Sequence, residues 1–246
     1  MRVEPAIEIS GLTKRYGAKT AVDNLSLTVF KGEIFALLGP NGAGKTTTIL
    51  MLMGLSSPDD GQRLVLGLDP GKRPLEVKKQ VGYLPENVGF YGDLNASENL
   101  SFVAALNGLD GAALKTAVDK ALETVELSAA AGQKLKTFSR GMRQRLGLAE
   151  VLLKSPRLLF LDEPTLGLDP DGIEKMLSLI VGLAEREGIT VVISSHLLPL
   201  VEKVAHRVAI LRNGRLLAEG SVAALAAEKG LQPGLETVYR HYFNLP

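Results

Sequence analysis

The chain has 246 residues, of which 46% are hydrophobic, and this is enough to form the core of one sizeable domain or of two closely packed lobes. Its formal net charge of +1 excludes a domain that is basic as a whole and follows a nucleic-acid backbone, although a local basic patch is compatible with it. The absence of cysteine excludes disulfides and thiolate metal ligands, and it suits a reducing cytosol.

The first residues, MRVEPAIEIS, lack the charged and then apolar layout of a signal peptide. No apolar stretch reaches the roughly 18 residues that a membrane-spanning helix needs. We therefore expect a protein that is soluble by itself, and any work at a membrane would require a partner chain.

Short strand patterns dominate the first third of the chain, at residues 6–10, 26–30, 33–39 and 63–67. Turn signals rich in glycine, proline and aspartate separate them. From about Ser97 to Leu153 the periodicity becomes helical, and we expect a helical insertion there.

The second half of the chain alternates between the two patterns. Continuous apolar runs at 158–162 and 189–196 flank a helical pattern at 172–187, as buried parallel strands joined by a crossover helix would. Residues 208–220 predict a hairpin around an Asn-Gly turn, and residues 235–243 predict a helix. One face of that helix carries Leu235, Val238, Tyr239 and Tyr242. The pattern predicts an α/β fold with a mostly parallel sheet.

The strongest chemical signal is GPNGAGKT, which fits the phosphate-binding loop pattern of a P-loop nucleotide-binding protein. A hydrophobic strand precedes it and a helical pattern follows it, so backbone N–H groups at a helix N-terminus would converge on a phosphate. Lys45 would reach the outer phosphates, and the Thr46 hydroxyl would be a ligand of Mg²⁺. The alternative is a flexible glycine turn. The predicted nucleotide-binding residues of this loop are Gly39, Pro40, Asn41, Gly42, Ala43, Gly44, Lys45, Thr46 and Thr47.

A second element, LLFLDEP, ends an apolar strand in two adjacent carboxylates, Asp162 and Glu163. Alternation along a strand points them in different directions, so they can have different roles. Asp162 would hold Mg²⁺ through water, and Glu163 would orient and deprotonate the water that attacks the γ-phosphate of ATP. Adjacent surface acids are common, and it is the apolar run before the pair, together with the phosphate loop, that favours catalysis.

With these motifs in place, the sequence resembles the nucleotide-binding domain of ATP-binding cassette (ABC) transporters along nearly its whole length. The resemblance implies that the α/β core is a P-loop NTPase fold with an antiparallel β subdomain and an inserted helical subdomain. It implies one domain over 1–246, with the core and β subdomain at 1–92 and 154–225. The helical subdomain would cover about 93–153, and a C-terminal helix about 226–246.

The same resemblance assigns further site residues. Tyr16 matches the aromatic residue on which adenine stacks, a contact worth about 1–3 kcal/mol, and the alternative is a surface tyrosine. His196, in ISSHLL, matches the switch histidine near the γ-phosphate, and the alternative is a structural role. Asp169 matches the loop that communicates across a dimer. The signature, within FSRGMRQR, would cap the nucleotide of a partner subunit through Ser139, Arg140, Gly141 and Met142.

Glu86 lies in GYLPENVGFY, where most members of the family have a glutamine that touches Mg²⁺ and the attacking water. A carboxylate is also a good ligand for a hard metal ion, so we predict a catalytic and metal-binding role for Glu86, against the alternative of a surface acid. The signature departs from the commonest form as well. Arg140 replaces a glycine and Met142 replaces a glutamine, whereas Ser139 and Gly141 are retained.

With these departures, the sequence resembles the ATPase chains of ABC-2 type exporters. Those chains pair with separate multi-spanning membrane subunits. The runs GYLPENVGFY, KTFSRGMRQRLGLAE and LETVYRHY also resemble the ATPase subunit of the complex that supports copper–sulfur cluster assembly in nitrous oxide reductase. The resemblance implies that the protein lies peripherally on the cytoplasmic side of the plasma or inner membrane. It also implies that the protein uses ATP and Mg²⁺ for export.

In the family, two chains arranged head to tail close around two ATP molecules. Because all the site motifs are intact in this one chain we expect a homodimer, and the alternative is a heterodimer. The alternatives are an ABC ATPase that acts on ribosomes or DNA and a binding module with a degenerate site. The chain contains neither a second cassette nor heptad-bearing coiled coils, and the catalytic motifs are intact. A basic cluster at Arg140, Arg143 and Arg145 fits a solvated helix face or an anion site better than nucleic acid, so we expect no nucleic-acid partner.

Overall fold

The computed structural model describes residues 4–244 and contains two β-sheets. The larger sheet has the strand order β5-β6-β7-β3-β8-β9, and only the pairing of β8 with β9 is antiparallel. Its strands are β3 (Ile34–Leu38), β5 (Val81–Leu84), β6 (Leu158–Asp162), β7 (Thr190–Ser195), β8 (Arg207–Arg212) and β9 (Arg215–Gly220). The α/β prediction with a mostly parallel sheet is confirmed.

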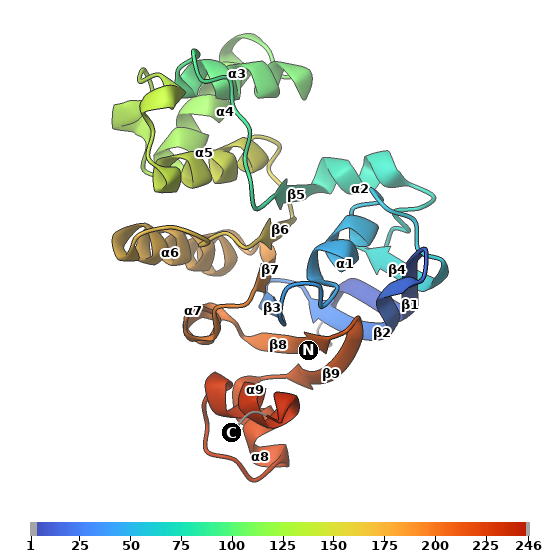
Figure 1. Cartoon of the computed structure of the whole chain (residues 1–246). Helices are drawn as coiled ribbons and strands as arrows, with labels where there is room; N and C mark the ends of the chain where they lie inside the picture. The colour runs from blue at the N-terminus through green and yellow to red at the C-terminus, as the bar shows by residue number, and fades with distance from the viewer. Residues whose placement is uncertain (1–3, 245–246) are drawn as a thin grey trace.

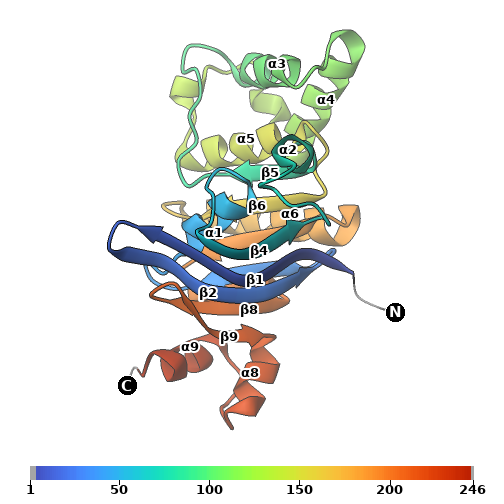
Figure 2. The same cartoon turned by 90° about the vertical axis from the view of Figure 1, so that its right-hand side faces the viewer.

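The smaller sheet is antiparallel, with the order β2-β1-β4. Its strands are β1 (Pro5–Tyr16), β2 (Lys19–Phe30) and β4 (Asp60–Val65). Two of them are longer than the short patterns at 6–10 and 26–30 predict. The β1–β2 hairpin continues through buried Leu12, Val22 and Leu25, but register shifts along it break the regular alternation of apolar and polar residues. Figure 2 shows this sheet in front of the larger one.

Apolar residues of the central strands alternate between two layers. Leu159 and Leu161 of β6 pack with the helical side of the molecule. Leu158 and Phe160 pack with the antiparallel sheet and with α1 (Lys45–Leu52). The strand is therefore buried on both faces, which is why its sequence is a continuous apolar run without polar alternation.

The predicted helical insertion forms a separate lobe beside β5 and β6 (Figure 1). It contains α3 (Ala96–Leu106), α4 (Gly111–Thr124), the short 3₁₀ segments Ser128–Ala130 and Leu135–Thr137, and α5 (Arg140–Leu152). Asn95 begins α3 in a capping box with Glu98, with both hydrogen bonds at 2.8 Å.

At Gly147 of α5, this lobe packs closely against the loop that carries Glu86. A Cβ atom on Gly147 of α5 would lie 2.7 Å from the side chains of Leu84 and Val88. Only glycine allows the helix to approach β5 and the following loop so closely. A displacement of α5 would therefore reach that loop directly.

The C-terminal part differs from the single helix expected over about 226–246. Two helices occur instead, α8 (Val222–Glu228) and α9 (Leu235–Phe243), whereas residues 245–246 lie outside the described residues. Gly230, with a φ of 65°, and the Pro233-Gly234 pair interrupt the helical path between them. The predicted apolar face of α9 is confirmed, because Leu235 and Val238 are buried and its tyrosines pack beside them.

Three short elements were not predicted: α2 (Pro74–Gln80), β5, and α7 (Leu198–Val204), while α6 (Pro170–Glu187) matches the predicted crossover helix. Each of the three has only four to seven residues, which is too few for a clear periodicity. Within residues 4–244 no helix combines the length and the apolar character required to cross a membrane.

Glu150 in the last turn of α5 gives a testable pH effect. Burial raises the pKa of its carboxyl above the usual value, and a negative charge is unfavourable near a helix C-terminus. Stability is therefore lost as the pH rises through the folded-state pKa. We expect Glu150→Gln to raise the free energy of unfolding by on the order of 0.5 kcal/mol at pH 7.5. The gain should disappear near pH 4, as measured by urea unfolding.

The matched control is Glu123→Gln, which removes an exposed acid from the last turn of α4. The change in the free energy of unfolding for Glu123→Gln measures the effect of removing a charge from a helix end. The difference from Glu150→Gln then measures the effect of burying that charge. An equal gain at both pH values for Glu150→Gln would contradict the expected role of its partly buried carboxyl.

Candidate nucleotide site

The phosphate loop connects β3 to α1 at the carboxyl edge of the parallel strands. Gly44 has a φ of 103°, and a Cβ atom there would lie 2.6 Å from the carbonyl oxygen of Ala21. Glycine is therefore required just before the helix begins at Lys45. The N-terminal N–H groups of α1 follow this turn, which is the arrangement that binds phosphate.

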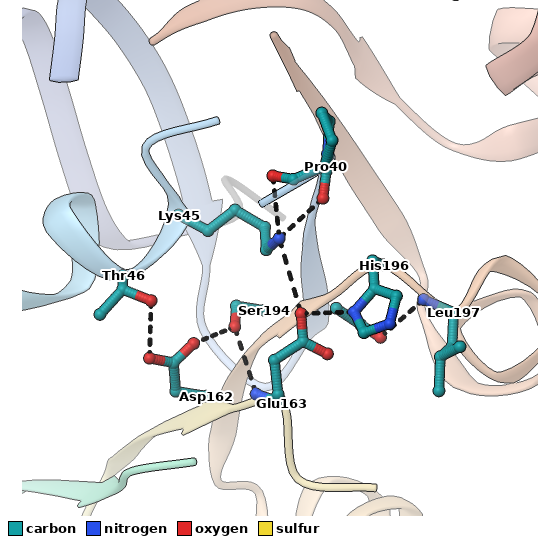
Figure 3. Close-up of polar contacts among 10 residues, drawn as sticks. Pro40, Lys45, Thr46, Asp162, Glu163, Ser194, His196 and Leu197 are labelled. Atoms are coloured by element: carbon teal, nitrogen blue, oxygen red, sulfur yellow. Dashed lines mark hydrogen bonds and ion pairs between the residues drawn. The ribbon is translucent and has the colours of Figure 1, made fainter. Parts of the chain in front are cut away.

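Lys45 is buried, with only 6% of its surface exposed. Its Nζ donates to the carbonyl oxygens of Gly39 at 2.7 Å and of Pro40 at 3.4 Å, and it lies 3.5 Å from Glu163 Oε1 (Figure 3). The cation is thus held inside the loop, beside the carboxylate that the sequence predicts to be catalytic.

Asp162 and Glu163 have different partners, as predicted, although β6 ends at Asp162 and it is the left-handed turn at Glu163, with a φ of 49°, that separates the two side chains. Asp162 Oδ2 accepts a hydrogen bond from Thr46 Oγ1 at 2.8 Å. Glu163 Oε1 lies 2.9 Å from His196 Nδ1, and Glu163 Oε2 is buried without a hydrogen-bond partner among the described residues. An unpaired buried carboxylate oxygen is costly, so a water or ligand atom is expected beside it.

A cavity of about 220 Å³ opens beside these groups. Tyr16, 51% exposed, lies in its wall with the hydroxyl 3.4 Å from Ser56 Oγ and its ring 5.3 Å from Lys14 Nζ. An exposed ring at this position is available for stacking, and Glu86 is an exposed part of the same wall. The lining consists of Tyr16, Lys19, Ala21, Asn41, Gly42, Ala43, Gly44, Lys45, Thr46, Thr47, Glu86 and Glu163.

A larger cavity, of about 460 Å³, lies between α4, the C-terminal end of α6 and the turn before β6. None of the predicted site residues lines it. Most of the residues predicted to bind nucleotide therefore line the smaller cavity and not the larger one.

The structure does not bring the signature or Asp169 into this cavity. Ser139 begins α5 by accepting a hydrogen bond from the Met142 N–H at 3.2 Å, and Asp169 begins α6 by accepting one from the Gly172 N–H at 3.0 Å. Arg140 packs on the Asp169 loop, because a Cβ atom on Gly167 would lie 2.4 Å from its Nη1. Signature residues Arg140, Gly141 and Met142 are, like Ser139, absent from the cavity wall.

Three residues at the site were missed by the sequence analysis. Lys19 adds a second cation to the cavity wall, and Ser194 bonds to Asp162 and Glu163. Tyr83 lies near Asp162, and its burial, together with that carboxylate and Glu86, raises the pKa of its hydroxyl to about 12. The hydroxyl therefore stays protonated and can donate to Asp162. The only sequence signal for Ser194 was its place in the apolar run at 189–196, and Tyr83 had none, because β5 was not predicted.

Oxygen donors suited to Mg²⁺ lie beside the cavity, where Thr46 belongs to the wall and Asp162, which does not line it, is the hydrogen-bond partner of Thr46. Thr46 Oγ1 and Asp162 Oδ2 lie 2.8 Å apart, and both are hard donors of the kind that this ion prefers. Within residues 4–244 no group of three or more His, Asp or Glu side chains could hold a metal. The donor set therefore fits an ion that is held partly by water and by phosphate oxygens.

Comparison with known proteins agrees with this geometry. The family model described as "ABC transporter" matches residues 22–166, more than half of the chain. The chain belongs to the ABC transporter family. It has the ATP-binding domain of that family, and its activity is ATP hydrolysis.

Two relatives and one solved structure illustrate the match. The chain is 45% identical to the bacitracin transport ATP-binding protein BcrA of Bacillus licheniformis, over 87% of this chain and 69% of that protein. It is 38% identical to the linearmycin resistance ATP-binding protein LnrL of Bacillus subtilis (strain 168), over 91% and 72% of the two chains. The structure of cbiO1 from Clostridium perfringens, part of the ABC transporter complex cbiONQ, matches with a TM-score of 0.85 at 26% identity, and 92% of each chain is covered.

Proposed function

We propose that this ATPase powers an ABC-2 type exporter from the cytoplasmic side of the plasma or inner membrane, together with a separate multi-spanning subunit. Two relatives support the proposal, because one is named for bacitracin transport and the other for linearmycin resistance. The sequence forms GYLPE and S-x-G-M-x-Q-R point to the same subfamily. The transported substrate would bind to the membrane subunit and not to this chain.

One observation carries the proposed catalytic role, namely the contact of Glu163 with both Lys45 and His196 beside the cavity. Lys45 would balance the charge of the outer phosphates. Glu163 would accept the proton of the attacking water on its unpartnered Oε2, while His196 holds Oε1 in place. A bound Mg²⁺ would neutralise charge on the phosphate oxygens, and we assign its binding to Thr46, Asp162 and Glu86.

The position of the signature supports a head-to-tail pair of chains. In its own chain the signature packs against the Asp169 loop and lies outside the cavity wall. Each nucleotide would therefore be covered by the second copy. The residues that would act across this pair are Ser139, Arg140, Gly141, Met142 and Asp169.

Movement would pass to the membrane subunit through the loop that carries Glu86. This loop begins at the end of β5, and its Val88 touches Gly147 of α5. The helix that begins with the signature is thus in contact with the loop that lines the nucleotide cavity. Closing of the pair would displace both together.

A co-purification experiment tests the transporter proposal. Tagged Glu163→Gln chain would be incubated with ATP and Mg²⁺ and recovered from detergent-solubilised membranes of the source organism, with mass spectrometry of the eluate. A multi-spanning membrane protein that is absent when Lys45→Ala chain is used is the expected result. Recovery of ribosomes or DNA-repair proteins without a membrane partner would overturn the proposal.

The same experiment separates the two transport systems that the sequence resembles. A membrane partner recovered together with a periplasmic maturation protein would favour the nitrous oxide reductase system. A membrane partner alone would favour a system like those of the two relatives, one named for bacitracin transport and the other for linearmycin resistance.

A further inference from the structure

Ser194 is a completely buried polar residue that contacts both carboxylate residues of the site. It lies in β7, which pairs in parallel with β6, and the register places Ser194 beside Asp162. Its Oγ donates a hydrogen bond to Asp162 Oδ1 and accepts one from the Glu163 N–H at 3.2 Å (Figure 3). One hydroxyl therefore joins the two residues to which different catalytic roles are assigned.

For Asp162, the hydroxyl of Ser194 fixes the rotation of the carboxylate. Oδ1 is occupied by Ser194 and Oδ2 by Thr46, so both oxygens have a defined direction. Thr46 belongs to the helix that follows the phosphate loop. With Oδ1 held by Ser194, Oδ2 stays directed toward the loop even when Thr46 turns its hydroxyl to another ligand.

For Glu163, the same serine stabilises an unusual backbone conformation. Glu163 has a φ of 49°, in the left-handed region, which costs a non-glycine residue about 1–2 kcal/mol. Its N–H donates to both the carbonyl oxygen of Ser194, at 3.1 Å, and the hydroxyl. This turn directs the Glu163 side chain toward Lys45 and His196 and away from Asp162.

We propose that Ser194 is a positioning residue for ATP hydrolysis. It holds the Asp162 carboxylate in the orientation that binds Mg²⁺ and holds Glu163 in the conformation that faces the attacking water. The inference rests on the ATPase activity of the chain and is independent of which partner the chain serves. Groups that orient the residues around a metal ion usually contribute about 10- to 100-fold to metal affinity or activity.

Ser195 is a second buried serine in β7, and comparison with it separates the effect of the Ser194 hydrogen bonds from the effect of burying a hydroxyl. It is also buried and is the next residue of the same strand, but its Oγ accepts a hydrogen bond from the Leu197 N–H at 3.0 Å. Its hydroxyl has no hydrogen bond to either carboxylate residue. Ser195→Ala is therefore the matched control for Ser194→Ala, because it removes a buried hydroxyl from the same strand.

The test measures steady-state hydrolysis, Mn²⁺ binding in the presence of ADP by electron paramagnetic resonance, and binding of a fluorescent ATP analogue without metal. We expect Ser194→Ala to lower kcat and to weaken Mn²⁺ binding by about 10-fold or more each. Metal-free nucleotide binding and the unfolding midpoint should stay close to those of the native chain. Ser194→Thr, which retains the hydroxyl, should recover most of the Mn²⁺ affinity.

Two results would overturn the proposal. One is native kcat and native Mn²⁺ affinity in a folded Ser194→Ala chain, and the other is an equal loss of both in Ser195→Ala. If Ser194→Ala does not fold, the Mn²⁺ affinities of Ser194→Thr and Ser194→Cys are compared instead. The proposal then requires tighter Mn²⁺ binding by the threonine chain, since its hydroxyl is the stronger donor, and equal binding by both would contradict it.

Discussion

Replacing Glu163 with glutamine is expected to lower ATP turnover by about 10²- to 10⁴-fold while ATP still binds. Glutamine has nearly the same shape, but its neutral amide cannot take a proton from the attacking water. Lys45, which also contacts this side chain, remains to bind phosphate. Turnover would be measured as phosphate release, and binding by titration with a fluorescent ATP analogue.

The control for this variant is Glu187→Gln, which removes an exposed acid from the end of α6, outside the nucleotide cavity. It should retain native turnover. If Glu163→Gln hydrolyses ATP at the native rate, Glu163 is not the general base, and the assignment of its unpartnered oxygen is wrong.

A Lys45→Ala chain is expected to lose ATP affinity by about 30-fold or more, since truncating one member of a buried, hydrogen-bonded charge pair usually costs about 2–5 kcal/mol. The carbonyl oxygens of Gly39 and Pro40 hold the buried Nζ inside the phosphate loop, and alanine removes the cation that would form the charge pair with the ATP phosphates. Isothermal titration with ATP and Mg²⁺ would measure the loss.

Lys31→Ala serves as the control for Lys45→Ala because Lys31 is a cation outside the nucleotide cavity. Its ATP affinity should equal that of the native chain. An affinity within twofold of native for Lys45→Ala would show that this lysine does not bind the phosphates.

The phosphate loop and the Asp162–Glu163 pair could be predicted because each is a local pattern attached to a strand. A loop that must approach phosphate needs glycine at fixed positions, and Gly44 has the left-handed conformation that this requires. The Asp162–Glu163 pair is likewise recognisable by the apolar run before it, but the two side chains diverge because Glu163 lies beyond β6 in a left-handed turn, and not because residues alternate along the strand. Recognition of both motifs depends only on neighbours in the sequence.

Ser194 and Lys19 could not be predicted because their contacts depend on distant segments. Ser194 and Asp162 are 32 residues apart and meet only through the register of β6 with β7. Lys19 reaches the cavity because the β1–β2 hairpin folds beside the phosphate loop. No local sequence pattern around Ser194 or Lys19 indicates that either residue belongs to the site.

Periodicity predicted the helix at 235–243, which is α9, whereas the single C-terminal helix of about 226–246 that the resemblance implies is interrupted. Gly230 and the Pro233-Gly234 pair supply that interruption, so the chain forms two short helices that pack on the same side of β8 and β9.

Mixing two inactive variants would test directly whether the site is shared between two chains. Lys45→Ala removes the phosphate-loop cation, and Gly141→Asp places an acid in the signature, where the nearest atoms to a new Cβ are 4.0 Å away, so the fold has room for it. Each variant alone should be inactive. Because a mixed head-to-tail pair contains one intact site, an equal mixture should recover roughly a quarter of native turnover by random pairing. Full activity of Gly141→Asp alone, or a mixture as inactive as its components, would contradict a site formed by two chains.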